Sequence, residues 1–99
     1  MNIKINSVKF VTSKRVEGFV HNKVKKLIQY YDDIISAEVY LKIENNQNLN
    51  NKVTEIKLEI PGNDLFAKKQ SKSFEESTDN AVNALKRQIT KHKNKLRRL

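Results

Sequence analysis

Residues 37–44 read Ala-Glu-Val-Tyr-Leu-Lys-Ile-Glu, and the first of every two side chains in this stretch is aliphatic. Successive side chains of a β-strand point to opposite faces of the sheet, so this alternation predicts a strand with one buried and one exposed face. The residues that follow, 45–51, have no period and are mostly amides, which is typical of a hairpin loop between two strands.

The segment after this loop shows the same two-residue period. Its aliphatic set, which we expect to point inward, is Ile56, Leu58 and Ile60. Its charged set, which we expect to point outward, is Glu55, Lys57 and Glu59. Pro61-Gly62-Asn63-Asp64 combines the residue types that tight turns require, and a short further strand is predicted over residues 65–71.

The N-terminal segment predicts one strand and one helix. Four apolar residues recur there at close to a two-residue period: Ile3, Ile5, Val8 and Phe10. This period predicts a first strand. After Thr12-Ser13, either of which can cap a helix, apolar residues recur at three- and four-residue steps over residues 14–31, which is the period of an amphipathic helix.

The C-terminal segment predicts a second, longer helix. Ser73-Phe74-Glu75-Glu76 matches a capping box, in which the Ser73 hydroxyl and the Glu76 carboxylate bond to each other's free backbone amides. The helix is predicted to run from there almost to Leu99. One narrow stripe of this helix is largely apolar: Phe74, Thr78, Ala81, Val82, Leu85, Ile89, His92 and Leu96.

The order of these elements is β-α-β-β-β-α, which is an α+β fold. A strand, helix and strand in succession form a right-handed crossover, so we expect the first two strands to be parallel and the later strands to form an antiparallel meander. A chain of 99 residues fits one compact domain. We therefore expect a single domain over residues 1–99, a four-stranded mixed sheet with both helices packed on one face.

Most of the excess positive charge falls on the last predicted helix. The chain has 20 Lys and Arg against 11 Asp and Glu, a net charge of +9. Residues 80–99 hold seven of the basic residues and no acidic one, which leaves 13 basic and 11 acidic residues for the rest of the chain. All seven lie off the apolar stripe. A helix surface with charges of one sign indicates a polyanionic partner rather than charges that are only solvated. Nucleic acid is the leading candidate for this partner, and an anionic membrane is the second.

The composition excludes several kinds of chemistry. The chain has no cysteine and only two glycines, so it lacks thiolate metal sites, disulfides and a phosphate-cradling glycine loop. His21 and His92 lie on different predicted helices without metal-ligand companions, and we expect His92 to be packed in the apolar stripe. We expect no enzyme, no metal and no cofactor. The lack of cysteine and of an apolar N-terminal segment predicts a cytoplasmic protein.

Three stretches are familiar from a known family: residues 27–32 (Leu-Ile-Gln-Tyr-Tyr-Asp), residues 39–44 (Val-Tyr-Leu-Lys-Ile-Glu) and residues 85–96 (Leu-Lys-Arg-Gln-Ile-Thr-Lys-His-Lys-Asn-Lys-Leu). Through them the chain resembles, over nearly its whole length, the ribosome hibernation promoting factor and ribosome-associated translation inhibitor family. The most specific part of the resemblance is the run of residues 87–93.

The resemblance implies the same fold and a function in translation. Family members bind the small ribosomal subunit and its rRNA in the channel used by mRNA and tRNA. They thereby hold ribosomes inactive, reversibly, in stationary phase or stress. By this resemblance the candidate rRNA-binding residues are basic side chains of the two helices: Lys23, Lys26, Lys86, Arg87, Lys91, Lys93 and Lys95.

Two positions depart from the family pattern. Ser73-Phe74-Glu75 stands where family members usually have Asp-Met-Tyr, and Gly18 replaces a side chain common in the family. The chain also ends at Leu99 without the C-terminal dimerisation domain of long-form members, so it resembles a short form. Ribosome pairing by such a form would need a second hibernation factor.

Two other interpretations fit a basic α/β domain. One is a stand-alone double-stranded RNA-binding module, although the usual order of that module begins with a helix. The other is a basic adaptor for an anionic membrane or an acidic protein, using the last helix as an amphipathic element. The narrow apolar stripe of that helix argues against deep membrane insertion.

Overall fold

The computed structural model describes residues 2–44 and 50–97 and confirms the predicted order of elements. The six elements are β1 (Asn2–Ser7), α1 (Lys14–Tyr30), β2 (Ser36–Ile43), β3 (Lys52–Ile60), β4 (Asn63–Ser71) and α2 (Phe74–Arg97). Residues 45–49, the greater part of the predicted hairpin loop, lie outside the described residues.

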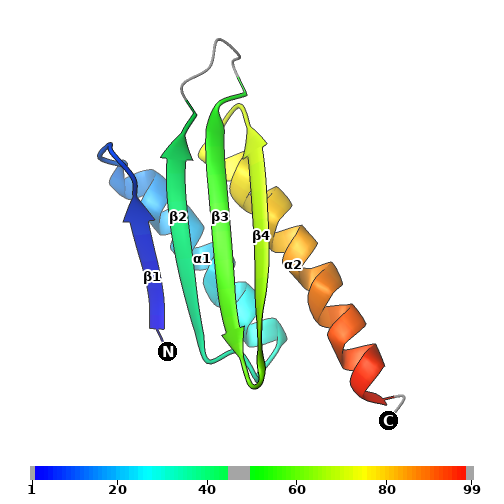
Figure 1. Ribbon diagram of the computed structural model, residues 1–99. Coiled ribbons are helices and arrows are strands. Elements are labelled where there is room, and N and C mark those ends of the chain that lie inside the picture. The colour runs from blue at the N-terminus through cyan, green and yellow to red at the C-terminus, as the bar shows by residue number, and fades with distance from the viewer. Residues whose placement is uncertain (1, 45–49, 98–99) are drawn as a thin grey trace.

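The four strands form one mixed sheet in the order β1-β2-β3-β4, and both helices cover the same face of it (Figure 1). β1 pairs with β2 in parallel, with Ile3 opposite Ala37, as the right-handed crossover requires. β2 with β3 and β3 with β4 are antiparallel. The predicted fold class is therefore correct, and the other face of the sheet is left open.

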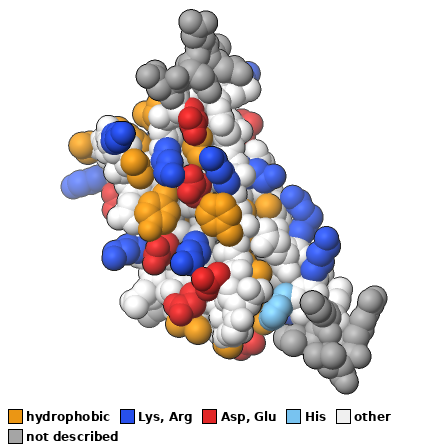
Figure 2. All heavy atoms as spheres, in the orientation of Figure 1, with side chains coloured by type: hydrophobic (Ala, Val, Ile, Leu, Met, Phe, Trp, Pro, Cys, Tyr) orange, Lys and Arg blue, Asp and Glu red, His pale blue; other side chains and the backbone are white. Residues whose placement is uncertain are grey.

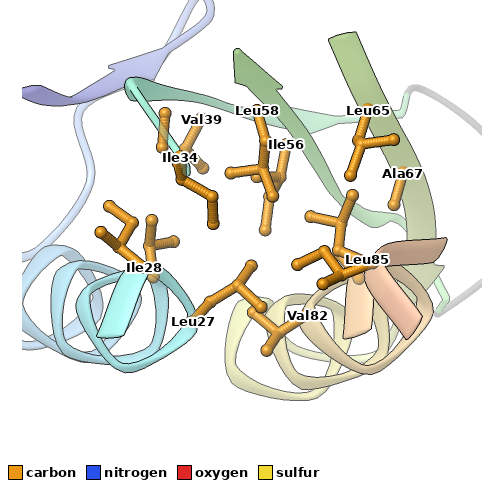
Figure 3. Packing of buried hydrophobic residues seen from close by; sticks show 14 of the residues in the cluster. Leu27, Ile28, Ile34, Val39, Ile56, Leu58, Leu65, Ala67, Val82 and Leu85 are labelled. Atoms are coloured by element: carbon orange, nitrogen blue, oxygen red, sulfur yellow. The ribbon is translucent and has the colours of Figure 1, made fainter. Parts of the chain in front are cut away.

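The core lies between the sheet and the two helices, and it contains the aliphatic sets predicted from sequence. In Figure 3, Leu27 and Ile28 of α1 and Val82 and Leu85 of α2 point toward the sheet. The sheet side chains that meet them alternate along their strands: Val39, Ile56, Leu58, Leu65 and Ala67. Burial of these apolar side chains is the main force that holds the helical layer on the sheet.

The first strand is shorter than its apolar pattern predicts. β1 ends at Ser7, and Lys9 has a φ of 65°, a left-handed conformation that turns the chain out of the sheet. Phe10 therefore does not extend the strand. Its ring stacks instead on that of Phe74, with ring centroids 5.4 Å apart and planes 2° apart, at the start of α2.

The turn between β3 and β4 is tighter than predicted. Ile60 pairs with Asn63, so only Pro61 and Gly62 connect the strands, and β4 begins two residues earlier than expected. Gly62 has a φ of 76°, which glycine adopts without the steric cost that a side chain would bring. The helical glycine, Gly18, is different: a Cβ there would meet no atom within 4 Å, so internal packing does not require glycine.

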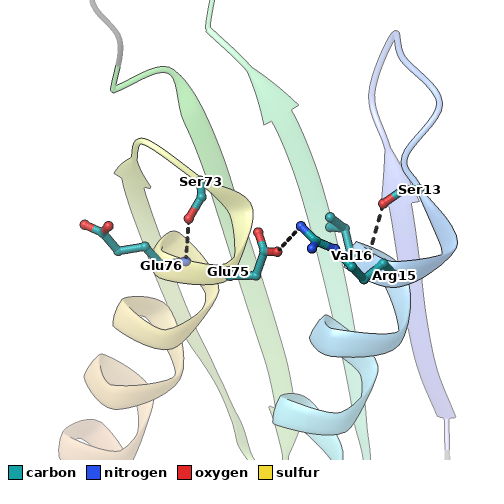
Figure 4. A network of polar contacts seen from close by, with 6 residues as sticks. All are labelled: Ser13, Arg15, Val16, Ser73, Glu75 and Glu76. Atoms are coloured by element: carbon teal, nitrogen blue, oxygen red, sulfur yellow. Dashed lines mark hydrogen bonds and ion pairs between the residues drawn. The ribbon is translucent and has the colours of Figure 1, made fainter.

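Serine hydroxyls cap both helices, as predicted. The Ser13 hydroxyl accepts a hydrogen bond from the Val16 amide at 3.2 Å, and the Ser73 hydroxyl accepts one from the Glu76 amide at 3.1 Å (Figure 4). The second half of the predicted capping box is absent from the described contacts, because the Glu76 carboxylate points away from Ser73 into solvent. α1 ends one residue before the predicted boundary, since Tyr31 is already extended.

Candidate nucleic-acid interface

The two helices lie side by side and begin at the same end of the molecule, so their first turns face each other (Figure 4). Two ion pairs join these first halves across the seam between the helices. Arg15 contacts Glu75 at 3.1 Å, and Lys23 contacts Asp79 at 3.1 Å. Each pair brings together one positive and one negative charge. The N-terminal half of the seam is therefore close to electrically neutral.

The second half of the seam is positive and is organised by Tyr30, the last residue of α1. The Lys93 ammonium lies 4.9 Å from the centroid of the Tyr30 ring, and the Lys86 ammonium lies 5.9 Å from it. The Tyr30 hydroxyl is 3.4 Å from the hydroxyl of Thr90. No acidic residue follows Asp79 on α2. The ring thus gathers two cations of α2 beside α1, and neither forms an ion pair within the described part of the chain.

Tyr31, next to this cluster, anchors the end of α1 in the core. The His92 ring meets the Tyr31 ring edge-on at 6.3 Å, and the Lys93 ammonium lies 5.1 Å from the Tyr31 centroid. Burial of Tyr31 raises the pKa of its phenol, and a hydrogen bond to Asp33 raises that pKa further. His92 is half-buried, which agrees with the predicted packing role.

The candidate contact residues occupy two flanks of the helical layer. Lys23, Lys26, Lys86 and Lys93 belong to the seam, although Asp79 already neutralises Lys23. Arg87 and Lys91 are exposed on the flank of α2 that faces away from α1. Lys95 lies in α2, but its side chain is outside the described residues. The structure thus divides the predicted set into two groups.

Sequence reasoning missed Tyr30. The ring is 48% exposed in the middle of the basic seam, whereas its neighbour Tyr31 is buried in the core. A signal for it was present in the spacing, because Lys23, Lys26 and Tyr30 follow one another at steps of three and four residues and therefore share one helix face.

The open face of the sheet carries charges of both signs, as predicted. Figure 2 shows red and blue side chains interspersed over the strands, whereas blue side chains line the border between β4 and α2. Lys42 contacts Glu55 at 2.8 Å, and this hydrogen bond raises the pKa of Lys42. Lys57 contacts Asp64 at 3.6 Å. Because these charges are paired, the open face has little net positive charge with which to attract a polyanion.

Two aromatic side chains also belong to this open face. Phe66 is 50% exposed, and Tyr40 donates a hydrogen bond of 2.8 Å to the Glu38 carboxylate. The same bond raises the pKa of Tyr40, because the ionised carboxylate stabilises the neutral phenol. An acid beside the ring opposes the approach of an RNA backbone. The helical layer is therefore the better candidate for nucleic-acid binding.

Within residues 2–44 and 50–97, no group of His, Asp and Glu side chains could hold a metal ion. No helix in this part of the chain is long and apolar enough to cross a membrane.

Comparison with known proteins identifies the family. The model of the Sigma 54 modulation protein / S30EA ribosomal protein family matches residues 3–97. The chain belongs to this family. One relative is the ribosome hibernation promoting factor of Escherichia coli K12, which is 32% identical over 97 residues that cover 98% of this chain and 96% of the relative.

A second member of the S30EA family is longer. The ribosome hibernation promotion factor of Bacillus subtilis is 30% identical over 100 residues, which cover 99% of this chain but 51% of the relative. This chain therefore spans about half the length of that protein.

Solved structures share the fold of this S30EA family member. A ribosomal subunit interface protein from Coxiella burnetii superposes with a TM-score of 0.83 at 19% identity, covering 95% of this chain and 99% of that one. The N-terminal domain of Thermus thermophilus Protein Y superposes with a TM-score of 0.76 at 22% identity, covering 93% and 99%. At these identities the likeness concerns the fold, and it confirms the β-α-β-β-β-α arrangement.

Proposed function

We propose that this protein is a ribosome hibernation factor that binds rRNA of the small subunit through its helical layer. The observation that carries the proposal is the one-signed charge of the second half of α2, where Lys86, Arg87, Lys91 and Lys93 have no acidic neighbour on the helix. The names of the curated relatives, which are ribosome hibernation factors, point to the same partner.

The charge and the elongated shape of the helical layer support this proposal. Lysine and arginine side chains on a rigid helix pair bind phosphates without reading base sequence, and such contacts position a protein on RNA. α2 is 24 residues long, and the molecule extends 47 Å along its longest axis. In this proposal the basic helical layer occupies the channel of the small subunit that mRNA and tRNA use.

Inhibition in this proposal is steric and reversible. The protein excludes mRNA and initiator tRNA while it is bound, and it makes or breaks no covalent bond in the ribosome. Each phosphate contact can dissociate and form again, so a ribosome released from the protein is active. The seven candidate contacts remain Lys23, Lys26, Lys86, Arg87, Lys91, Lys93 and Lys95.

One experiment tests both which ribosomal subunit binds the protein and whether mRNA and tRNA compete with it. Purified protein is sedimented through sucrose gradients with isolated small subunits, with isolated large subunits, and with small subunits preloaded with mRNA and initiator tRNA. The proposal expects the protein to travel with empty small subunits and to be largely displaced by preloading. Co-migration with large subunits alone, equal binding to preloaded subunits, or cleaved rRNA in the bound fraction would contradict it.

A further inference from the structure

A polar hollow lies outside the seam, on the side of α2 that faces away from α1. Four side chains line it, Lys69 from β4 and Asn80, Asn83 and Arg87 from α2, and its volume is about 210 Å³. Two of the four are cationic, two are amides that can donate hydrogen bonds, and none is a carboxylate. This chemistry selects an anion with several acceptor oxygens.

Lys69 reaches the hollow because of its position on an edge strand. Side chains of β4 alternate, and Leu65 and Ala67 point into the core, so Lys69 also emerges on the helix side of the sheet. It is half-buried and is paired with Thr54 of β3 in the sheet register. An inward lysine on an edge strand also opposes strand addition, but that role explains neither the arginine nor the amides.

The three α2 residues share one face. Asn80, Asn83 and Arg87 are separated by three and four residues, so their side chains lie along one line of the helix. Asp79 is the acid nearest to them in sequence, but its ion pair with Lys23 holds its carboxylate toward α1. Glu76, one turn before Asn80, is exposed on the same outward flank and does not line the hollow.

We propose that this hollow binds one phosphate group and that the phosphate belongs to an RNA backbone. The guanidinium of Arg87 offers a planar pair of N–H donors that matches two phosphate oxygens, and Lys69 adds a second positive charge from another element. The amides of Asn80 and Asn83 supply further donors. The assignment to RNA rests on the proposed function, whereas the phosphate chemistry stands on the lining residues alone.

The first arm of the test uses inorganic phosphate and the free protein. NMR spectra record the side-chain NH₂ signals of Asn80 and Asn83 during titration with phosphate, with chloride at equal ionic strength as the control. Saturable shifts are expected with phosphate and not with chloride, and they should be lost in Lys69→Gln. Asn83→Asp, at an exposed helix position, should also abolish the shift of the remaining Asn80 signals. Shifts that are equal for both salts, or unchanged in Lys69→Gln, would overturn the phosphate site.

The second arm tests the RNA source. Lys68→Gln is the matched control for Lys69→Gln, because Lys68 is the adjacent lysine and is exposed on the opposite face of the sheet. Small-subunit binding is measured over a range of KCl. One lost phosphate contact should lower the slope of log K against log salt by about 0.7 in Lys69→Gln and leave Lys68→Gln near wild type.

The two arms fail in different ways. If both variants bind the small subunit with the same slope while the NMR shifts persist, the hollow holds free phosphate and the RNA assignment is wrong. If the wild-type protein does not bind ribosomes at all, the proposed function fails, and the NMR titration still decides whether the hollow binds phosphate.

Discussion

The ammonium nitrogen of Lys93 lies 4.9 Å from the centre of the Tyr30 ring, so an aromatic side chain at the end of α1 fixes a cation of α2. The negative face of the ring attracts the ammonium, and the same ring attracts Lys86 at 5.9 Å. Two positive charges that would otherwise repel each other are thereby held together on the surface. The contact links the packing of the helices to the RNA binding that we propose.

Replacement of Tyr30 should weaken ribosome binding without removing any charge. Tyr30→Ala releases both lysines, which must then be ordered when RNA binds. The ring holds them with about 0.5–1 kcal/mol in the free protein, and an ordering cost of this size weakens the binding constant about two- to fivefold. Tyr30→Phe keeps the ring and should bind like wild type. Co-sedimentation with small subunits measures both. An alanine variant that binds as tightly as wild type, or a phenylalanine variant as weak as alanine, would refute the role of the ring.

Removal of a carboxylate from the seam should strengthen binding. Asp79→Asn frees Lys23 from its ion pair and adds one unit of positive charge to the helical layer. The matched control is Asp64→Asn, which frees Lys57 on the open sheet face with the same change in net charge. Only Asp79→Asn should tighten binding and steepen its salt dependence. Equal effects of the two variants would show that only net charge matters.

The sequence patterns correctly predicted the elements whose formation depends on residues close together in the chain. They failed where contacts between residues far apart in the chain determine the position of a side chain. Alternation located β2 and β3, because each strand has one buried face. It placed Phe10 in the first strand, but the left-handed backbone at Lys9 and the ring of Phe74 determine where Phe10 lies. No local pattern encodes either of these.

In the candidate site, too, the sequence predicted local features and missed contacts between distant residues. Helical spacing located the basic flanks of α2. It could not reveal that Asp79 neutralises Lys23, nor that Tyr30 holds Lys93, because each contact joins two helices that are far apart in the chain. The role of Lys69 was missed for a similar reason. A lysine in a strand is expected to be exposed to solvent, and only the packing of α2 beside β4 places Lys69 in the hollow.

A buried chain of hydroxyl groups between β3 and α2 should be important for stability. Thr54 Oγ1 lies 2.7 Å from Ser77 Oγ and 3.2 Å from Thr78 Oγ1, and Ser77 donates to the carbonyl of Phe74 at 3.2 Å. Each hydroxyl has one proton, so Thr78 donates to Thr54 and Thr54 donates to Ser77. All three side chains are fully buried.

Thr54→Val breaks this chain while conserving shape. It leaves the Thr78 hydroxyl without an acceptor and the Ser77 oxygen without a donor, which should lower the free energy of unfolding by about 1–3 kcal/mol. Urea denaturation measures the change, with Thr54→Ser as the control that keeps the hydroxyl. A valine variant as stable as wild type would contradict the assigned hydrogen bonds.

Alkaline pH should remove the stabilisation that two hydrogen bonds on the open sheet face contribute to the folded protein. Hydrogen bonding to Glu38 raises the pKa of Tyr40 above 10.0, and hydrogen bonding to Glu55 raises the pKa of Lys42 above 10.5. In both cases the folded pKa exceeds the unfolded one. The stabilisation is therefore complete below about pH 10 and is lost as the pH rises through the folded values.

Absorbance near 295 nm follows the ionisation of tyrosine and tests this shift. The difference between titrations of wild type and Tyr40→Phe should give a midpoint above 10.0, and Glu38→Gln should move that midpoint back toward 10.0. A Tyr40 midpoint at or below 10.0 in the wild-type protein would show that the bond to Glu38 does not form in solution.

The central claim, that the helical layer binds the ribosome, is tested most directly by comparing two triple variants with equal charge. Lys86→Gln/Arg87→Gln/Lys91→Gln removes three exposed cations of α2, and Lys4→Gln/Lys57→Gln/Lys68→Gln removes three from the open sheet face. Small-subunit binding is measured over a range of KCl, after circular dichroism has shown both variants to be folded. The α2 triple should bind far more weakly, with a salt slope smaller by about 2, while the sheet triple stays near wild type. Equal loss in both variants, or greater loss in the sheet triple, would contradict the account.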